Sequence, residues 1–155
     1  MDIGIIADTH DRMPVIKKAI EFFEDNSIRH LFHVGDFIAP FAVRALLRFR
    51  GEIYAVYGNN DGEKDGLKKL LPDITDIIEV ELEGKKIVLA HREEMINKKK
   101  LGSFNVAIFG HTHKAKIVES KPLIINPGEA CGWLYGKCTI ATVDLSRMAA
   151  EIIEI

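Results

Sequence analysis

Three short apolar runs in the first third of the chain alternate with two segments of helical periodicity. This alternation constrains the fold more than any other feature of the sequence. The runs at 2–7, 30–34 and 53–57 are typical of buried strands. Between them, apolar residues recur at helical spacing over 13–25 and 41–48. A βαβαβ order of this kind predicts a parallel sheet with right-handed crossovers.

The pattern changes after this first third, because strands then outnumber helices. The tight-turn pair Glu83-Gly84 separates two apolar runs and indicates a hairpin. Two stacked mixed sheets flanked by helices accommodate such a mixture, which belongs to the α/β class. The elements expected here are a helix at 64–71, strands at 77–82 and 86–90, a weak helix at 93–101, and strands at 105–109, 116–119, 123–125, 138–143 and 149–155.

Length and charge exclude several classes of protein. The 155 residues suit one domain, spanning 1–155. A formal net charge of −2 predicts no extended nucleic-acid surface. No apolar run reaches the roughly 18 residues of a membrane helix, and the start of the chain lacks the basic region of a signal peptide. We therefore expect a cytoplasmic protein without a membrane partner, in which Cys131 and Cys138 are small buried side chains rather than a disulfide.

Polar side chains gather just past five of the predicted strands. In open α/β sheets, ligands bind beyond the carboxyl ends of the strands, so these side chains are expected at one edge. His-x-His is the most specific of the signals, because both imidazoles can reach one region from a short loop. The segments, in chain order, are Asp8-Thr9-His10, Gly35-Asp36, Gly58-Asn59-Asn60-Asp61, His91 and Gly110-His111-Thr112-His113.

Taken one at a time, these segments have structural interpretations. Asp8 or Thr9 alone is typical of a helix cap or a turn, and His30 and His33, which lie in or beside a strand, are expected to be structural. Taken together, two carboxylates, four imidazoles and an amide oxygen exceed the four ligands of a lone zinc site. Seven ligands suit two metal ions about 3.5–4 Å apart, with one carboxylate shared between them.

The five segments, in this order, resemble the calcineurin-like metallophosphoesterases, and the resemblance covers residues 1 to about 145. The small size and Asn126-Pro127-Gly128 are most similar to the compact bacterial and archaeal phosphodiesterase branch. The resemblance implies a four-layer αββα sandwich and two divalent transition-metal ions, Mn²⁺ or Ni²⁺ before Zn²⁺ or Fe. It implies metal ligation by Asp8, His10 and His113 at the first ion, by Asn59, His91 and His111 at the second, and by Asp36 at both.

The implied activity is that of a metal-dependent phosphoric diester hydrolase with a small phosphodiester substrate. A hydroxide bridging the metals attacks phosphorus in line, so Asp36 and Asn59 count as catalytic residues, and Asn59 helps neutralise the equatorial oxygens. Many relatives place His where this chain has Asn60, which we also count as catalytic and substrate-binding. An amide cannot act as a general acid at neutral pH, so we expect a preference for diesters with good leaving groups, such as aryl esters.

Other positions depart from the relatives or support the site. His91 is followed by Arg92-Glu93-Glu94 where many relatives have Gly and a further His. Arg92 is a candidate substrate-phosphate contact, and capping of the next helix by Glu93 is the favoured alternative use of this segment. Glu129 stands where relatives have a small polar residue. Supporting residues around the ligands are expected to be Asp61, Thr112 and Asn126, the last also being open to interpretation as a simple turn.

Two other functions compete with hydrolysis. An interaction scaffold of the same fold, like the retromer subunit, is expected to have lost ligand residues, whereas every ligand position is filled here. A nuclease acting on long nucleic acid would need a basic face or an added domain. Neither the natural substrate nor the oligomeric state follows from the sequence.

Overall fold

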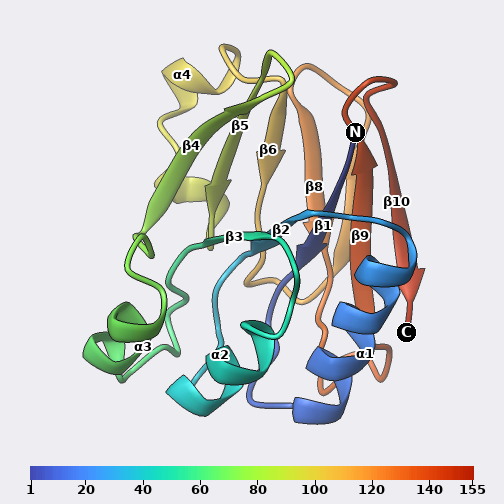
Figure 1. The fold of residues 1–155 in the computed structure, drawn as a ribbon. Coiled ribbons are helices and arrows are strands. Elements are labelled where there is room, and N and C mark those ends of the chain that lie inside the picture. Colours follow the sequence, from blue (N-terminus) through green and yellow to red (C-terminus); the bar gives the residue numbers. More distant parts are fainter.

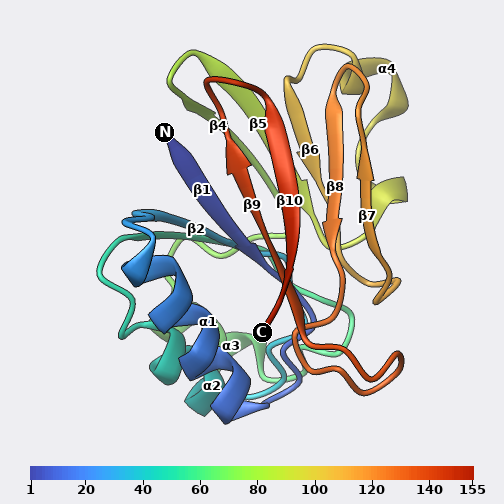
Figure 2. The same ribbon diagram turned by 90° about the vertical axis from the view of Figure 1, so that its right-hand side faces the viewer.

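The computed structural model describes residues 1–155 as two five-stranded sheets packed face to face, with helices on the outside (Figures 1 and 2). The first sheet has the strand order β10-β9-β1-β2-β3 and the second the order β4-β5-β6-β8-β7. The strands of the first sheet are β1 (Asp2–Ile6), β2 (His30–His33), β3 (Glu52–Ala55), β9 (Thr139–Asp144) and β10 (Ala149–Glu154). Those of the second are β4 (Ile77–Leu82), β5 (Lys85–Ala90), β6 (Val106–Ile108), β7 (Ala115–Val118) and β8 (Leu123–Pro127).

Three helices cover the outer face of the first sheet: α1 (Met13–Asp25), α2 (Pro40–Leu46) and α3 (Lys64–Leu70). The apolar stripe of α1, which includes Ile16, Ala19 and Phe23, is buried with Leu31 of β2 and Val43 of α2. This layer forms because i, i+3, i+4 spacing on the helices meets every second residue of the strands.

A second apolar layer fills the space between the sheets. Ile3, Ile5 and Phe32 of the first sheet share it with Leu89 and Ile108 of the second, and all five are fully buried. On the far face of the second sheet lie a 3₁₀ turn (Glu93–Met95) and the short helix α4 (Lys98–Leu101), which complete the fourth layer (Figure 2). The predicted four-layer α/β sandwich with two mixed sheets is confirmed.

The predicted βαβαβ start and the hairpin are also confirmed. β1, β2 and β3 are parallel neighbours, and β4 pairs antiparallel with β5 across Glu83-Gly84, both of which have positive φ. Most strand ends fall within one or two residues of the predicted bounds. The pattern predicted one helix over 93–101, and this was wrong. Asn97 has extended backbone and its side chain accepts a hydrogen bond from Lys99 N, so it caps α4 and divides the segment.

Parallel order in both sheets positions the polar loops. β1, β2 and β3 run in the same direction, and β5 and β6 are likewise parallel to each other, so each group presents its carboxyl ends at one edge. The loops that follow these five strands are the ones that carry the predicted ligands. None of the helices has the length and apolar character needed to cross a membrane.

Candidate metal centre

The loops at the carboxyl ends of the strands hold their polar residues in an uncommon backbone conformation. Five predicted ligands have positive φ, a region that side-chain-bearing residues rarely occupy and that costs about 1–3 kcal/mol each. They are Asp8 (51°), His10 (42°), Asp36 (58°), His111 (65°) and His113 (61°). Such conformations persist only where the surrounding structure holds them, and they are common at functional sites.

The first cluster consists of Asp8, His10, Asp36 and His113. One ligand atom from each of these residues lies within 4.8 Å of all the others. His113 Nε2 lies 3.5 Å from Asp8 Oδ1, and His10 Nε2 lies 3.4 Å from Asp36 Oδ2. These four residues come from three loops, after β1, β2 and β6, so both sheets contribute to the cluster.

The second cluster is built around His91. Its Nε2 lies 3.0 Å from Asn59 Oδ1 and 3.6 Å from Asp36 Oδ2. The ring of His111 stands edge-on to the His91 ring, with 5.1 Å between centroids. Asp36 Oδ2 therefore lies near imidazole nitrogens of both clusters, which is the position of a shared ligand.

Hydrogen bonds on the outer side of two imidazoles decide which atoms face inward as acceptors. His91 Nδ1 lies 2.7 Å from the carbonyl of Val34, which can only accept, so Nδ1 carries the proton. His113 Nδ1 likewise donates to the Glu129 carboxylate at 2.7 Å. In the neutral rings, both Nε2 atoms then present lone pairs toward carboxylate and amide oxygens.

Buried polar atoms without a hydrogen-bond partner are stabilised when a cation binds between them. Asp8 Oδ1 and His10 Nε2 are buried and have no hydrogen-bond partner, which is costly unless another group binds them. Mixed imidazole nitrogen and carboxylate oxygen donors suit divalent transition metals. The donor set and the two unpartnered atoms therefore fit the metal ions that the sequence predicts.

The buried charges of the two clusters perturb one another. Burial, together with the nearby charge of Asp36, raises the pKa of Asp8 from 3.8 to about 8. Burial also lowers the pKa of His10. At His111, burial and then the positive charge of Arg92 lower the pKa. Each shift disfavours the charged form of the group, because burial is the largest cause in all three.

Gly58 permits the close approach of the β2 and β3 loops. A Cβ atom at this position would lie 2.0 Å from Asp36 Oδ1 and 2.2 Å from Asp36 N. Any side chain would push the shared carboxylate away from both clusters. Glycine at position 58 is therefore required by packing as well as by the turn.

The three predicted supporting residues hold loop backbones rather than imidazoles. Asp61 is buried and accepts hydrogen bonds from the N–H groups of Asp36 (3.1 Å), Ile38 (2.8 Å) and Gly58 (2.7 Å). Asn126 donates to the Gly110 carbonyl (2.8 Å) and to Thr112 Oγ1 (3.0 Å), while Gly128 N donates to its Oδ1 (3.0 Å). Asn126 is thus both a turn residue and a support of the His-x-His loop.

The two predicted substrate contacts differ in what they touch. Asn60 is exposed, and its backbone N–H and side-chain amide both donate to Asp36, at 2.9 and 2.8 Å. Arg92 lines a hollow of about 320 Å³ together with His111, Lys114 and Lys116. The alternative use of this segment, a cap by Glu93, is wrong, because no side chain caps the 3₁₀ turn and Asn97 caps α4.

The remaining histidines lie outside the clusters. His30 lies 3.3 Å from exposed Glu52. His33 is buried, stacks on Phe37 at 3.6 Å, and accepts a hydrogen bond from Gly35 N at Nδ1. Its Nε2 then carries the proton that Thr9 Oγ1 accepts, at 3.2 Å, and burial lowers the pKa of His33 well below 6.5. The hydroxyl of Thr9 donates in turn to the Asp36 carbonyl.

Sequence reasoning missed the role of Glu129. This buried carboxylate accepts from His113 Nδ1 and also from the backbone N–H groups of Leu134 and Tyr135. Burial by itself raises the pKa of Glu129, but these hydrogen bonds outweigh it and hold the pKa at about 2. The only sequence signal was its departure from the relatives, because nothing in the spacing links position 129 to position 113.

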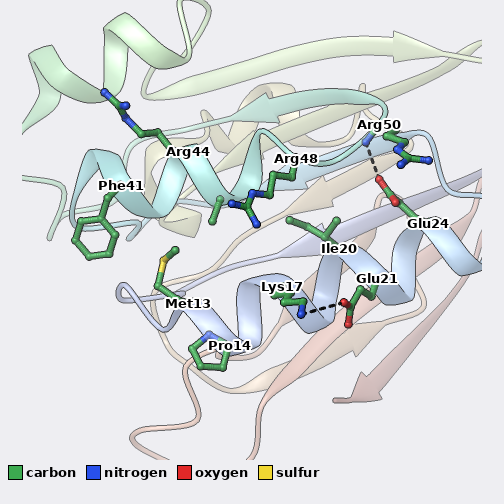
Figure 3. A pocket seen from close by; sticks show the side chains of 11 residues that line it. Met13, Pro14, Lys17, Ile20, Glu21, Glu24, Phe41, Arg44, Arg48 and Arg50 are labelled. Atoms are coloured by element: carbon green, nitrogen blue, oxygen red, sulfur yellow. Dashed lines mark hydrogen bonds and ion pairs between the residues drawn. The ribbon is translucent and has the colours of Figure 1, made fainter.

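A hollow larger than the one beside Arg92 lies away from the two clusters. A groove of about 500 Å³ runs between α1 and α2 on the helical face, with Arg44 and Arg48 on one side and Lys17 and Glu21 on the other (Figure 3). No predicted ligand lines this groove. Volume alone would therefore have favoured this groove over the hollow beside the two clusters as the functional site.

Comparisons with known proteins identify the family of this chain. A family model described as the calcineurin-like phosphoesterase superfamily domain matches residues 1–148. The phosphodiesterase MJ0936 of Methanocaldococcus jannaschii is 41% identical over 159 aligned positions, which cover 95% of each chain. A solved structure of a novel archaeal phosphodiesterase superposes with a TM-score of 0.92 and 38% identity over the whole of both chains.

More distant structures share the fold alone. The phosphoesterase YfcE of E. coli has a TM-score of 0.76 and 21% identity, with both chains covered completely. Vps29 of Entamoeba histolytica has a TM-score of 0.72 and 16% identity, covering this chain fully and 99% of that chain.

Proposed function

The chain belongs to the calcineurin-like phosphoesterase superfamily and is a metal-dependent phosphoester hydrolase, and from this premise we propose that it is a phosphodiesterase with a two-metal centre. The observation that carries the proposal is that Asp8 Oδ1 and His10 Nε2 are buried without a hydrogen-bond partner in a cluster of four possible ligand residues. Asp8, His10 and His113 would hold one ion, and Asn59, His91 and His111 the other. Asp36 would contribute to both.

Bound divalent ions, for which we favour Mn²⁺ or Ni²⁺, supply Lewis acidity toward a phosphoryl oxygen and a hydroxide nucleophile at neutral pH. The chain's own residues keep the ligands in place. The Val34 carbonyl and Glu129 bond to Nδ1 of His91 and His113, so that Nε2 is the ligand atom of the neutral ring in both.

Asn60 donates to Asp36 and is placed to contact the substrate as well. One amide hydrogen of Asn60 is used on Asp36 Oδ2, which leaves the second free for a phosphoryl oxygen. The amide cannot protonate a departing alkoxide, so esters with acidic leaving groups react faster. Arg92 supplies a further positive charge beside His111 for the substrate phosphate.

The test of the metal-centre proposal is a hydrolysis panel. Protein loaded with Mn²⁺, Ni²⁺ or Zn²⁺ should hydrolyse bis(p-nitrophenyl) phosphate, and activity should be lost after chelation. Asp36→Asn should lower kcat by about 10²-fold or more, since it removes a ligand charge shared by both ions. Asp65→Asn, on exposed α3, is the matched control and should retain full activity. An active, metal-independent Asp36→Asn variant would refute the proposal.

The leaving-group preference has a separate test in Asn60→His. An imidazole at this exposed position can donate a proton, so hydrolysis of esters with poor, alkyl leaving groups should rise, by up to about 10²-fold. Hydrolysis of p-nitrophenyl esters, whose leaving group needs no proton, should change little. An equal change in both classes would show that residue 60 does not govern leaving-group departure.

A further inference from the structure

Three consecutive large apolar residues stand exposed beside the metal centre. Trp133, Leu134 and Tyr135 have exposed fractions of 64%, 68% and 51%, the first two being the highest among the exposed large apolar side chains. We call these three residues the aromatic rim. The Trp133 ring lies 5.7 Å from that of His10, and Lys114 Nζ lies 5.7 Å from the centre of the Tyr135 ring. The rim has no part in the ligand set or in the chemistry proposed above.

Hydrogen bonds to the backbone of its loop hold the rim in this exposed position. The buried Glu129 carboxylate accepts hydrogen bonds from Leu134 N at 2.9 Å and Tyr135 N at 2.6 Å. At the base of the loop, Cys131 N donates to the Asp8 carbonyl at 3.0 Å, and Arg12 donates to the Cys131 carbonyl. The backbone that carries the rim is therefore tied directly to two metal-ligand residues, since Glu129 also accepts from His113.

A fixed, exposed apolar surface next to a polar centre favours a particular kind of ligand. Contiguous apolar patches mark binding sites more often than singly exposed side chains do. Indole and phenol rings offer flat faces to another planar ring, and a surface that is already ordered loses little entropy on binding. One phosphate ester can span the 5.7 Å between the Trp133 and His10 rings. Its phosphate would lie at the metal centre and its esterified group at the rim.

We propose that the aromatic rim binds a planar aromatic group esterified to the substrate phosphate, such as a nucleobase-bearing or aryl group, with Trp133 as the stacking partner. The substrate class is then aromatic phosphodiesters, and Lys114 adds a positive charge at the same edge. This inference rests on the proposed function, because it assigns one part of the substrate of that same centre.

Trp133 is the only tryptophan of the chain, so its fluorescence reports on the rim alone. Zinc-loaded protein is titrated with AMP and, in parallel, with ribose 5-phosphate, which carries the same phosphate without the base. AMP should quench the fluorescence saturably, and ribose 5-phosphate should not. Tyr135→Ala should raise the dissociation constant of AMP by about tenfold, as loss of one stacking partner does. Phe41→Ala, an exposed aromatic on α2 in the groove that contains no ligand residue, is the control and should change nothing.

Inhibition gives a second measurement that does not rely on fluorescence. AMP should inhibit hydrolysis of bis(p-nitrophenyl) phosphate more strongly than ribose 5-phosphate does. Trp133→Ala should raise the inhibition constant of AMP at least tenfold and leave that of ribose 5-phosphate unchanged. Equal inhibition by the two compounds in the wild type, or an unaffected Trp133→Ala variant, would overturn the proposal.

The two proposals fail in different ways. If wild-type protein hydrolyses no diester but AMP still quenches Trp133, the proposed function fails and the aromatic site remains. If hydrolysis is normal and the rim variants bind AMP as the wild type does, the rim assignment fails alone. If Trp133→Ala instead converts an oligomer to monomers in sedimentation, with no quenching by AMP in the wild type, the rim joins copies of the chain and the proposal is wrong.

Discussion

At the scale of single residues, the centre combines groups that destabilise the metal-free protein. Asp8 is fully buried, has an unpartnered oxygen, and adopts a φ of 51°. Asp36, with a φ of 58°, is nearly fully buried beside it. Such features are expected where evolution has favoured metal binding over stability.

The cost of the Asp8 charge can be measured with Asp8→Asn. In the folded, chelator-treated protein the Asp8 pKa is about 8, whereas the unfolded chain releases this proton near its ordinary value of 3.8. The Asp8 contribution to stability is therefore present at low pH and is lost as pH rises from about 4 to 8. Asn keeps an oxygen for the N–H group of His111 and does not titrate.

We therefore expect Asp8→Asn to raise the Tm of the metal-free protein at pH 8 by roughly 3 °C or more, with a smaller difference at pH 5. Thermal melts in chelator at both pH values check this, with Asp65→Asn as the surface control. A variant less stable than the wild type at pH 8 would contradict the expectation.

Thiol reactivity tests a second buried residue. Both cysteines are free, as the sequence predicted, but only Cys131 is fully buried. Burial and the nearby Glu129 carboxylate raise the pKa of the Cys131 thiol to about 12, so almost no thiolate forms at pH 8. Native protein should therefore react with one equivalent of a thiol reagent, at Cys138, and with two after unfolding. Mass spectrometry of the labelled peptides distinguishes the two sites.

At the scale of elements, the ligand loops keep their shape through buried side chains that bond to the loop backbones: Asp61 accepts from N–H groups, and Asn126 donates to the Gly110 carbonyl. Asp61 joins the β2 loop to the β3 loop, and Asn126 joins the β6 loop to the end of β8. Backbone hydrogen bonds also continue from the strands into these loops, where Asp8 N donates to the Gly35 carbonyl and His10 N to the Asp36 carbonyl, and the buried side chains add to them.

Asp61→Asn is a specific test of that arrangement. Asp61 Oδ2 accepts from both Asp36 N and Gly58 N, and Asn would place an NH₂ group against at least one backbone donor. The variant should lower the free energy of unfolding by about 2–4 kcal/mol, measured by urea denaturation. Replacing Asp65 in the same way should cost less than about 0.5 kcal/mol.

The helical stretch at 93–101 illustrates why elements are misjudged from periodicity. Met95, Ile96 and Leu101 pack against the outer face of the second sheet, but from two short turns rather than one helix. A side-chain cap at Asn97 competes with continued helix formation. The apolar side chains can pack on the sheet from one helix or from two short turns, so their spacing does not distinguish the two.

At the scale of the whole molecule, the centre lies where the two sheets meet. Asp8, Asp36 and Asn59 follow strands of the first sheet, while His91, His111 and His113 follow strands of the second. Most of the contact between the sheets is apolar packing, which is not directional, and hydrogen bonds from His91 to the Val34 carbonyl and from His111 N to Asp8 join them at the centre. Bound metal ions would add directional bonds from one sheet to the other.

We therefore expect Mn²⁺ to raise the Tm. At 100 times the dissociation constant the stabilisation is about 2.7 kcal/mol, or several degrees for a chain of this size. Differential scanning calorimetry with increasing Mn²⁺ measures it. His91→Ala and Asp36→Asn should reduce the metal-dependent increase, and an increase of the same size in Asp36→Asn would place the binding elsewhere.

The sequence by itself determined the order of the elements, the two-sheet architecture and the loops that carry Asp8, Asp36 and the His-x-His pair. This was possible because local periodicity and turn residues mark strand ends, and parallel strands bring those ends to one edge. Only the tertiary structure decided which atoms face inward, because tautomers depend on partners distant in the chain, such as Val34 for His91 and Glu129 for His113. The exposure of Trp133 is equally non-local, since its loop is held by the Glu129 carboxylate, which bonds both the His113 imidazole and the loop's own backbone.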